Sequence, residues 1–164
     1  MTGPRAGLGR KGTGMNGWRK LVAGGVIVAA GLAGFGGVAA AGGRPVSTDL
    51  NPTEEVPGPG DPNASGHADI TLNQGENEVC FDLSWSEIDG TVVAAHIHVG
   101  PAGVAGPVVV GLFSGAFAGT DETSGCVNAD ADLIKAIRKD PSSYYVNVHS
   151  TTFPAGAVRG QLGD

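Results

Sequence analysis

Basic side chains are scarce over most of this 164-residue sequence. Residues 1–41 carry five Lys and Arg and no acidic residue, whereas residues 42–164 carry the other five and all 16 Asp and Glu, a net charge of −11. A chain this acidic, with no basic patch, repels phosphate backbones, which excludes nucleic acid as a partner. The length predicts one domain and excludes a large multidomain enzyme.

Signatures of common catalytic and phosphate-binding sites are missing as well. The stretch GPAGVAG at 100–106 has neither the GxGxxG nor the GKS/T arrangement, so we do not expect it to bind phosphate. Ser142 and Ser150, which lie near His149, lack the elbow motif of serine hydrolases. Because no catalytic constellation stands out, we expect a protein that is not an enzyme.

The first 41 residues predict a signal peptide. Lys20 is followed by an uncharged stretch, 21–41, that ends in small residues, and this order is typical of a secretory signal. The stretch is also long enough to span a bilayer, so a retained N-terminal anchor is the alternative, and the chain could start at Met1 or Met15. No Cys near Ala41 and no twin Arg are present, which favours the general secretory route. We expect a secreted or cell-surface protein that contacts the membrane only if 21–41 is retained.

Only two cysteines are present, Cys80 and Cys126, and they do not form a CxxC motif. Outside the cytoplasm, a lone pair of cysteines most simply forms one disulfide. A metal thiolate or redox pair is the alternative. A disulfide that closes a loop of this length stabilises the fold by about 4 kcal/mol in the chain-entropy model.

Alternating apolar and polar residues, separated by turn residues, predict β-strands. The expected strands are 47–50, 67–73, 79–85, 91–99, 108–113, 144–150 and 157–162. Seven or so short strands predict an all-β fold, an antiparallel β-sandwich of immunoglobulin-like or Greek-key type. We place the domain at 42–164, with a core of about 46–162.

One short helix is expected over 131–139. Leu133, Ile134 and Ile137 fall on one side of it, and Asp130 precedes it as a potential N-cap. The helix therefore interrupts a chain that otherwise predicts strands.

Three of the four histidines lie in two predicted strands. His96 and His98 share one face of the first strand, with their Cα atoms about 6.5–7 Å apart. His149 shares a face of the second strand with Tyr145 and Asn147. If the two strands are neighbours, three imidazoles can converge, and three neutral His ligands with an open fourth position suit zinc or copper.

A structural role for these histidines is the alternative. Two histidines in a strand can equally bind backbone carbonyls and carboxylates and so fix loops at the end of a sandwich. His67, next to Asp69, is expected to be solvated. Arg159 is the one basic residue in the last predicted strand, and we expect it to pair with a carboxylate such as Glu55.

Five stretches together resemble the CHRD domain family, which is repeated in chordin and stands alone in many exported bacterial proteins. These stretches are EEVPG (54–58), CFDLSW (80–85), AAHIHVGPAGVAGPVVVGLF (94–113), YYVNVHS (144–150) and FPAGAVRGQL (153–162). The resemblance runs from about Val46 to Leu162 and implies an immunoglobulin-like β-sandwich. It does not imply the growth-factor antagonism of chordin, which resides in other modules.

The family motif maps onto five residues of this chain without giving them a catalytic role. These residues are Glu55, His96, His98, His149 and Arg159. The segment before Arg159 departs from the family pattern, because Ala-Gly-Ala-Val replaces a version in which Gly-Glu-Ile is common. This departure removes one potential carboxylate near the histidines.

A weaker resemblance links the chain to copper/zinc superoxide dismutase, which also has an HxH strand, a further strand His and a disulfide in a β-sandwich. The zinc half has no counterpart, and His67 is the one histidine left to act as a fourth copper ligand. We therefore expect an exported, non-enzymatic structural or binding module with an extracellular or cell-surface partner. The alternative is a copper- or zinc-binding protein that uses His96, His98 and His149, with dismutase-like redox chemistry as a minor branch.

Overall fold

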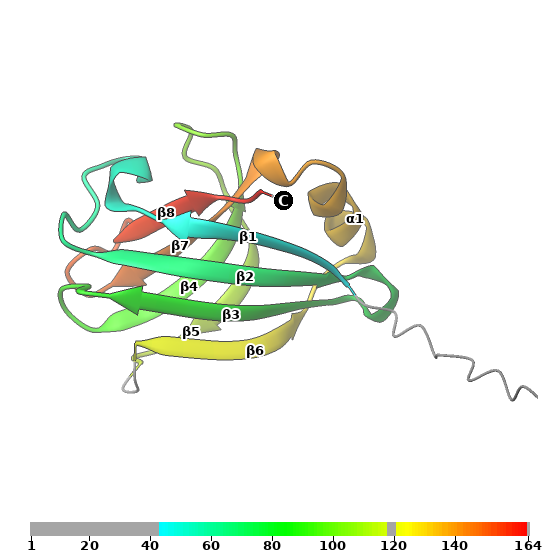
Figure 1. The fold of residues 1–164 in the computed structure, drawn as a ribbon, viewed down its shortest axis with the longest axis horizontal. Coiled ribbons are helices and arrows are strands. Elements are labelled where there is room, and N and C mark those ends of the chain that lie inside the picture. Colours follow the sequence, from blue (N-terminus) through cyan, green and yellow to red (C-terminus); the bar gives the residue numbers. More distant parts are fainter. Residues whose placement is uncertain (1–42, 118–120, 164) are drawn as a thin grey trace, which may run out of the picture. The chain divides into compact units, whose positions relative to one another are not determined.

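Two four-stranded antiparallel sheets form the body of the protein in this computed structural model, which describes residues 43–117 and 121–163 (Figure 1). Sheet 1 has the strand order β1-β2-β3-β6. Its strands are β1 (Arg44–Leu50), β2 (Ser65–Asn73), β3 (Glu78–Ser86) and β6 (Glu122–Asn128). The all-β sandwich predicted from the alternating sequence is confirmed.

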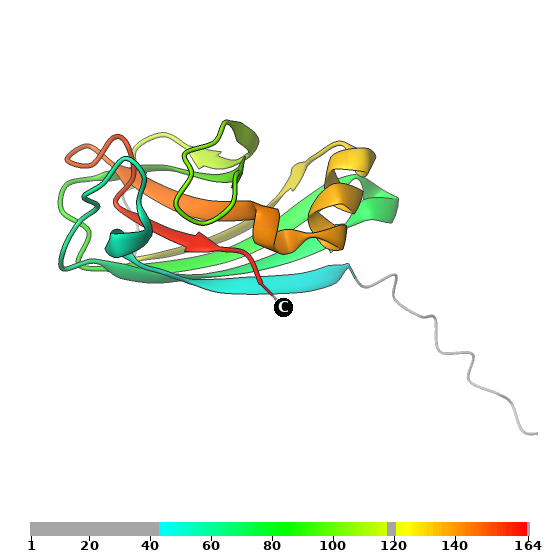
Figure 2. The ribbon, with the colours of Figure 1, turned by 90° about the horizontal axis from the view of Figure 1, so that it is seen from above.

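Sheet 2 has the strand order β5-β4-β7-β8 and lies behind sheet 1 in Figure 1. Its strands are β4 (Val92–Val99), β5 (Val108–Ser114), β7 (Tyr144–Ser150) and β8 (Val158–Gln161). The chain crosses between the sheets at the β3–β4, β5–β6 and β6–β7 connections. Figure 2 shows the two layers from above.

The core is formed by the inward faces of both sheets. In β2 and β3 the buried residues alternate as predicted, with Ile70 and Leu83 fully enclosed. Ile97, Val146 and Val148 supply the facing side from sheet 2. Strand β7 is buried on both faces, because loops cover its outer side. This covered outer face of β7 carries His149, one of the three histidines singled out in the sequence.

Strand β6 was not predicted, although it carries Cys126. Its inward positions include Gly125, whose Cα hydrogens face the ring of Phe81, so that Phe81 fills the space that a side chain of β6 would occupy. The strand therefore has a weak apolar alternation. The disulfide between Cys80 and Cys126 is confirmed, and it joins directly opposite positions of β3 and β6.

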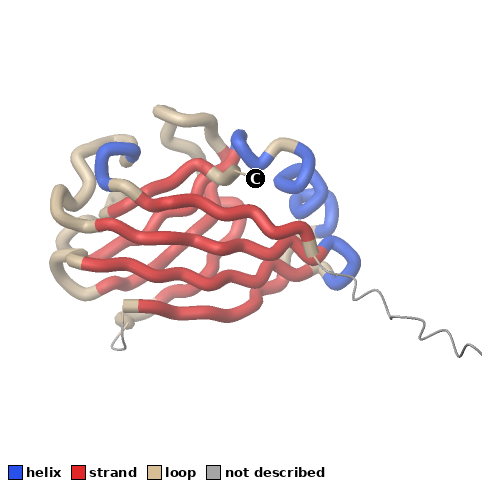
Figure 3. Tube along the Cα trace, viewed as in Figure 1, coloured by secondary structure: helices blue, strands red, loops and turns tan. Residues whose placement is uncertain are grey.

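The predicted helix is confirmed as α1 (Ala131–Lys139), in the β6–β7 connection. The Asp130 carboxylate accepts hydrogen bonds from the backbone N–H groups of Asp132 and Leu133, and Ile134 and Ile137 are buried. Figure 3 shows the helical segments at the ends of the strands. Three are short 3-10 turns, Pro52–Glu54, Gln74–Glu76 and Pro141–Ser143.

Two isolated bridges link β1 to the C-terminal segment. Ser47 pairs with Gly163, and Asn51 pairs with Arg159, so the edges of the two sheets meet on this side. Among the described residues, no helix is long and apolar enough to cross a membrane. The predicted signal segment, 1–41, lies outside the described residues.

Candidate metal centre

The three histidines singled out in the sequence come together on the outer face of sheet 2. Strands β4 and β7 are neighbours, with His96 opposite Asn147 and Ala94 opposite His149. One ring nitrogen from each of His96, His98 and His149 lies within 4.8 Å of the others. The sequence predicted that the three imidazoles converge if the two strands are neighbours. The strands are neighbours, and the imidazoles converge.

His98 presents a buried nitrogen without a partner. Its Nδ1 is 2.8 Å from the carbonyl oxygen of Gly106, which can only accept, so Nδ1 carries the proton. In the neutral ring Nε2 then has a free lone pair. This atom is buried and has no hydrogen-bond partner, and the side chain is only 8% exposed. Such a lone pair can bind a metal ion or accept a hydrogen bond from a donor group.

Both ring nitrogens of His149 face oxygen acceptors. Its Nδ1 is 3.2 Å from the carbonyl oxygen of Pro154, and its Nε2 is 3.0 Å from Oδ1 of the buried Asn147, so the two acceptors compete for the single proton of the neutral ring. Nε2 of His149 also lies 3.1 Å from Nδ1 of His96. His98 is thus the ring whose contacts leave an unprotonated, unpartnered nitrogen in the cluster.

The surroundings of His96 and His149 favour the neutral form of these two imidazoles. Burial, together with the neighbouring His149 and His98, lowers the pKa of His96 to about 4. Burial also lowers the pKa of His149 below its usual range. Neutral imidazole is the form that coordinates a metal ion, so near pH 7 neither His96 nor His149 has to lose a proton first.

An aromatic and cationic layer supports His98. The ring of Tyr145 stacks on His98 with centroids 4.7 Å apart and planes at 10°. The guanidinium of Arg159 lies 3.4 Å from the Tyr145 ring centroid, and the Gly106 N–H donates to the Tyr145 hydroxyl. The sequence placed Tyr145 and Asn147 on the face of His149 but gave no sign of these contacts.

Comparison with known proteins assigns the family. The CHRD domain matches residues 46–162, which covers most of the chain. The protein belongs to the CHRD domain family. No curated protein and no solved structure matches the chain.

Arg159 and Glu55, two motif residues of the CHRD domain, are both buried. The guanidinium donates to the carbonyl oxygens of Val104 and Pro101, and to Oε1 of Gln161. Its charge lowers the pKa of Glu55, but burial outweighs it and raises that pKa to about 7. The Arg159 charge favours the ionised form of Glu55, and the predicted ion pair between the two side chains stays a prediction.

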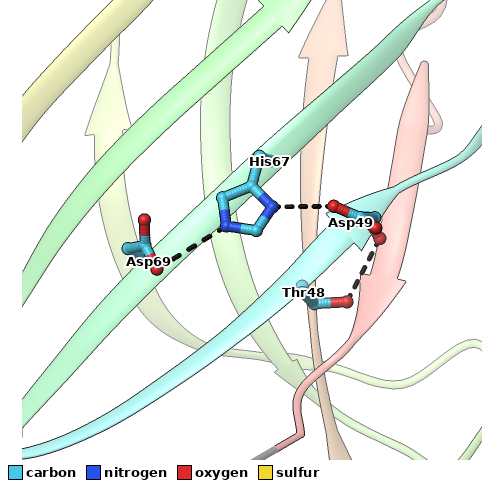
Figure 4. Close-up of polar contacts among 4 residues, drawn as sticks. All are labelled: Thr48, Asp49, His67 and Asp69. Carbon is cyan, nitrogen blue, oxygen red and sulfur yellow. Dashed lines mark hydrogen bonds and ion pairs between the residues drawn. The ribbon is translucent and has the colours of Figure 1, made fainter.

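His67 lies apart from the metal-ligand candidates of the CHRD domain. It projects from β2 in sheet 1, where Nδ1 is 2.8 Å from Asp49 and Nε2 is 3.6 Å from Asp69 (Figure 4). The side chain is 44% exposed, and the hydrogen bond with Asp49 raises its pKa. His67 is thus part of an exposed polar network, and it does not supply a fourth ligand to the cluster.

Proposed function

We propose that this exported CHRD-domain protein is a non-enzymatic binding module that holds a copper or zinc ion through His96, His98 and His149. The observation that carries the proposal is the convergence of three ring nitrogens within 4.8 Å, one of them the buried, unpartnered Nε2 of His98. Imidazole nitrogen is a preferred ligand of both metals. A bound ion would satisfy the lone pair that the Gly106 carbonyl leaves on Nε2 of His98.

The proposed location outside the cytoplasm is supported by two features. Cys80 and Cys126 form a disulfide, and disulfides persist mainly in oxidising compartments. The basic and then uncharged sequence of residues 1–41 has the features of a secretory signal. A cell-surface or extracellular protein is the expected partner of such a module.

Dismutase-like redox chemistry is not part of this proposal. His67 is engaged by Asp49 in the other sheet, and the cluster contains no carboxylate among the described residues. Superoxide is also an anion, and an acidic body disfavours its approach. The supported activity is metal binding itself.

The test is metal analysis of the full chain, expressed with its N-terminal segment and purified from the exported fraction without a nickel column. We expect close to one copper or zinc per chain, lost in a His96→Ala/His98→Ala variant. His67→Ala is the matched control and should keep its metal, because His67 lies in the other sheet. Metal-free wild-type protein whose melting temperature does not respond to added copper or zinc would overturn the proposal and leave the structural role.

A further inference from the structure

A hollow of about 330 Å³ lies in the loop between β1 and β2. Its lining is mostly carbon and consists of Pro52, Thr53, Glu55, Gly58, Pro59, Gly60 and Pro62. Small-molecule sites are typically concave and apolar, with a few polar groups that fix the ligand. The hollow matches this description, with Glu55 as its ionisable group.

The loop that forms this hollow is held in place at several points. The N–H of Gly60 donates to the carbonyl of Pro52, and the N–H of Asp61 donates to the carbonyl of Ala157. A side chain at Gly60 would collide with that same carbonyl of Ala157, at 2.4 Å. The Asp61 side chain is fully buried and accepts the N–H of Asp89. The hollow is therefore a built feature of the fold.

Glu55 has an unsatisfied acceptor. The residue is only 6% exposed, and its Oε1 is buried without a hydrogen-bond partner. The carboxylate lies against the backbone of Gly156, where a Cβ atom would come within 2.4 Å of it. Arg159 does not supply the missing donor, because its hydrogen bonds go to Val104, Pro101 and Gln161. Leaving a buried carboxyl oxygen unpaired is costly, so a donor from outside the chain would stabilise it.

We propose that this hollow binds a small organic amine, whose ammonium group pairs with the carboxylate of Glu55 while its carbon body packs against the prolines. An ammonium is a strong donor to a carboxylate, and the charge-assisted bond favours it over a neutral donor. The acidic body, with five basic against 16 acidic residues from 42 to 164, also attracts a cation.

The inference is independent of the metal centre. None of the three histidines lines the hollow, and the two sites can fail separately. Neighbouring Glu54 offers a matched control, because it is exposed and does not line this hollow.

The experiment is an NMR titration of the full exported protein with cyclohexylamine at about pH 8, where Glu55 is ionised. We expect saturable shifts of the amide signals of Glu55, Gly58 and Gly60. Cyclohexanol and cyclohexanecarboxylate, which have the same ring without the ammonium, should bind at least about tenfold more weakly. Glu55→Gln should weaken amine binding by a similar factor, and Glu54→Gln should not.

Three results would overturn the inference. They are no saturable shift in wild-type protein, shifts that arise elsewhere in the chain, and equal binding of cyclohexanol and cyclohexylamine. The comparison of the three ring compounds needs only wild-type protein, so it decides the matter even if Glu55→Gln does not fold. A metal-free protein that still binds the amine would leave this inference standing while the metal proposal falls.

Discussion

Two backbone carbonyls decide which nitrogens of the histidine cluster are available. Gly106 accepts from Nδ1 of His98 and so fixes the tautomer of that ring, whereas the Pro154 carbonyl, which lies beside Nδ1 of His149, positions the second ring. Fixing a ligand ring through its second nitrogen is a common way in which proteins orient metal-binding histidines. The same carbonyls would also hold the rings in a purely structural role, so the unpartnered Nε2 of His98 is what favours an ion.

Glu55 makes the stability of the protein depend on pH. Burial raises its pKa from 4.5 to about 7 in the folded state. Between these values the folded protein binds more protons than the unfolded chain, so the free energy of unfolding falls as pH rises through this window. The loss is complete above about pH 7 and amounts to as much as about 3 kcal/mol, at about 1.4 kcal/mol for each pKa unit.

Replacing Glu55 with glutamine should remove this loss. We expect Glu55→Gln to unfold like wild type at about pH 5, and to have a higher free energy of unfolding at about pH 8. Urea unfolding at the two pH values measures the difference. Exposed Glu54 provides the control, since Glu54→Gln should change little at either pH. If Glu55→Gln changes the free energy of unfolding equally at both pH values, then the ionisation of Glu55 is not the cause of the pH dependence.

At the scale of elements, β8 holds the loop between β4 and β5 beside the histidine cluster. Arg159 donates to the carbonyls of Pro101 and Val104, and Gln161 donates to the carbonyl of Gly100. The far end of this loop carries Gly106, whose carbonyl orients His98. Arg159 hydrogen-bonds to no histidine ring nitrogen, but through this loop it is coupled to the position of the His98 ring.

Arg159 should therefore act as a positioning residue for His98. Lysine keeps the charge but lacks the planar, forked donor group, so Arg159→Lys should loosen the loop. We expect the affinity for zinc, measured by competition with a chelator on folded protein, to fall by about tenfold to a hundredfold.

The matched control is Arg138→Lys in α1, which should leave the affinity for zinc unchanged. Wild-type affinity in Arg159→Lys would show that the loop does not depend on Arg159. A wild-type protein without zinc affinity would instead count against the metal proposal as a whole. The two failures are thus distinguishable.

Strand parity made half of the histidine cluster predictable. The spacing of His96 and His98 fixes their common face, whatever the fold. That β7 lies beside β4 depends on the path of the whole chain, and the sequence left it conditional. The carbonyls of Gly106 and Pro154 had no sequence signal at all, because any residue carries a carbonyl and only the course of a loop brings it to a ring.

Strand β6, which was not predicted from the sequence, has a similar explanation. β6 was passed over because Gly125 leaves room for the Phe81 ring, which removes an apolar side chain from the alternation. The α1 helix was predicted in full, because its N-cap and its apolar side are both local features of the sequence. Local signals thus predicted elements, whereas contacts made across the sandwich had to be observed.

At the scale of the whole molecule, the disulfide and the histidine cluster lie in different sheets. The disulfide joins β3 and β6 in sheet 1, and the histidines belong to β4 and β7 in sheet 2. Neither cysteine contacts the ligand atoms of the histidine cluster, since the two groups of candidate ligands are separate. Covalent and metal-linked stabilisation should therefore be separable.

Removing the disulfide should lower stability without removing the metal. In the chain-entropy model, a closed loop with a sequence separation of 46 contributes about 4 kcal/mol, because the cross-link restricts the unfolded chain. We expect Cys80→Ser/Cys126→Ser to lose about this much in urea unfolding while it keeps the metal content of wild type. Reductant should reproduce the loss in wild type and leave the variant unchanged. A variant that remains folded and yet loses its metal would mean that sheet 1 controls the geometry of the histidines. That result would contradict the expectation that the disulfide and the histidine cluster act independently.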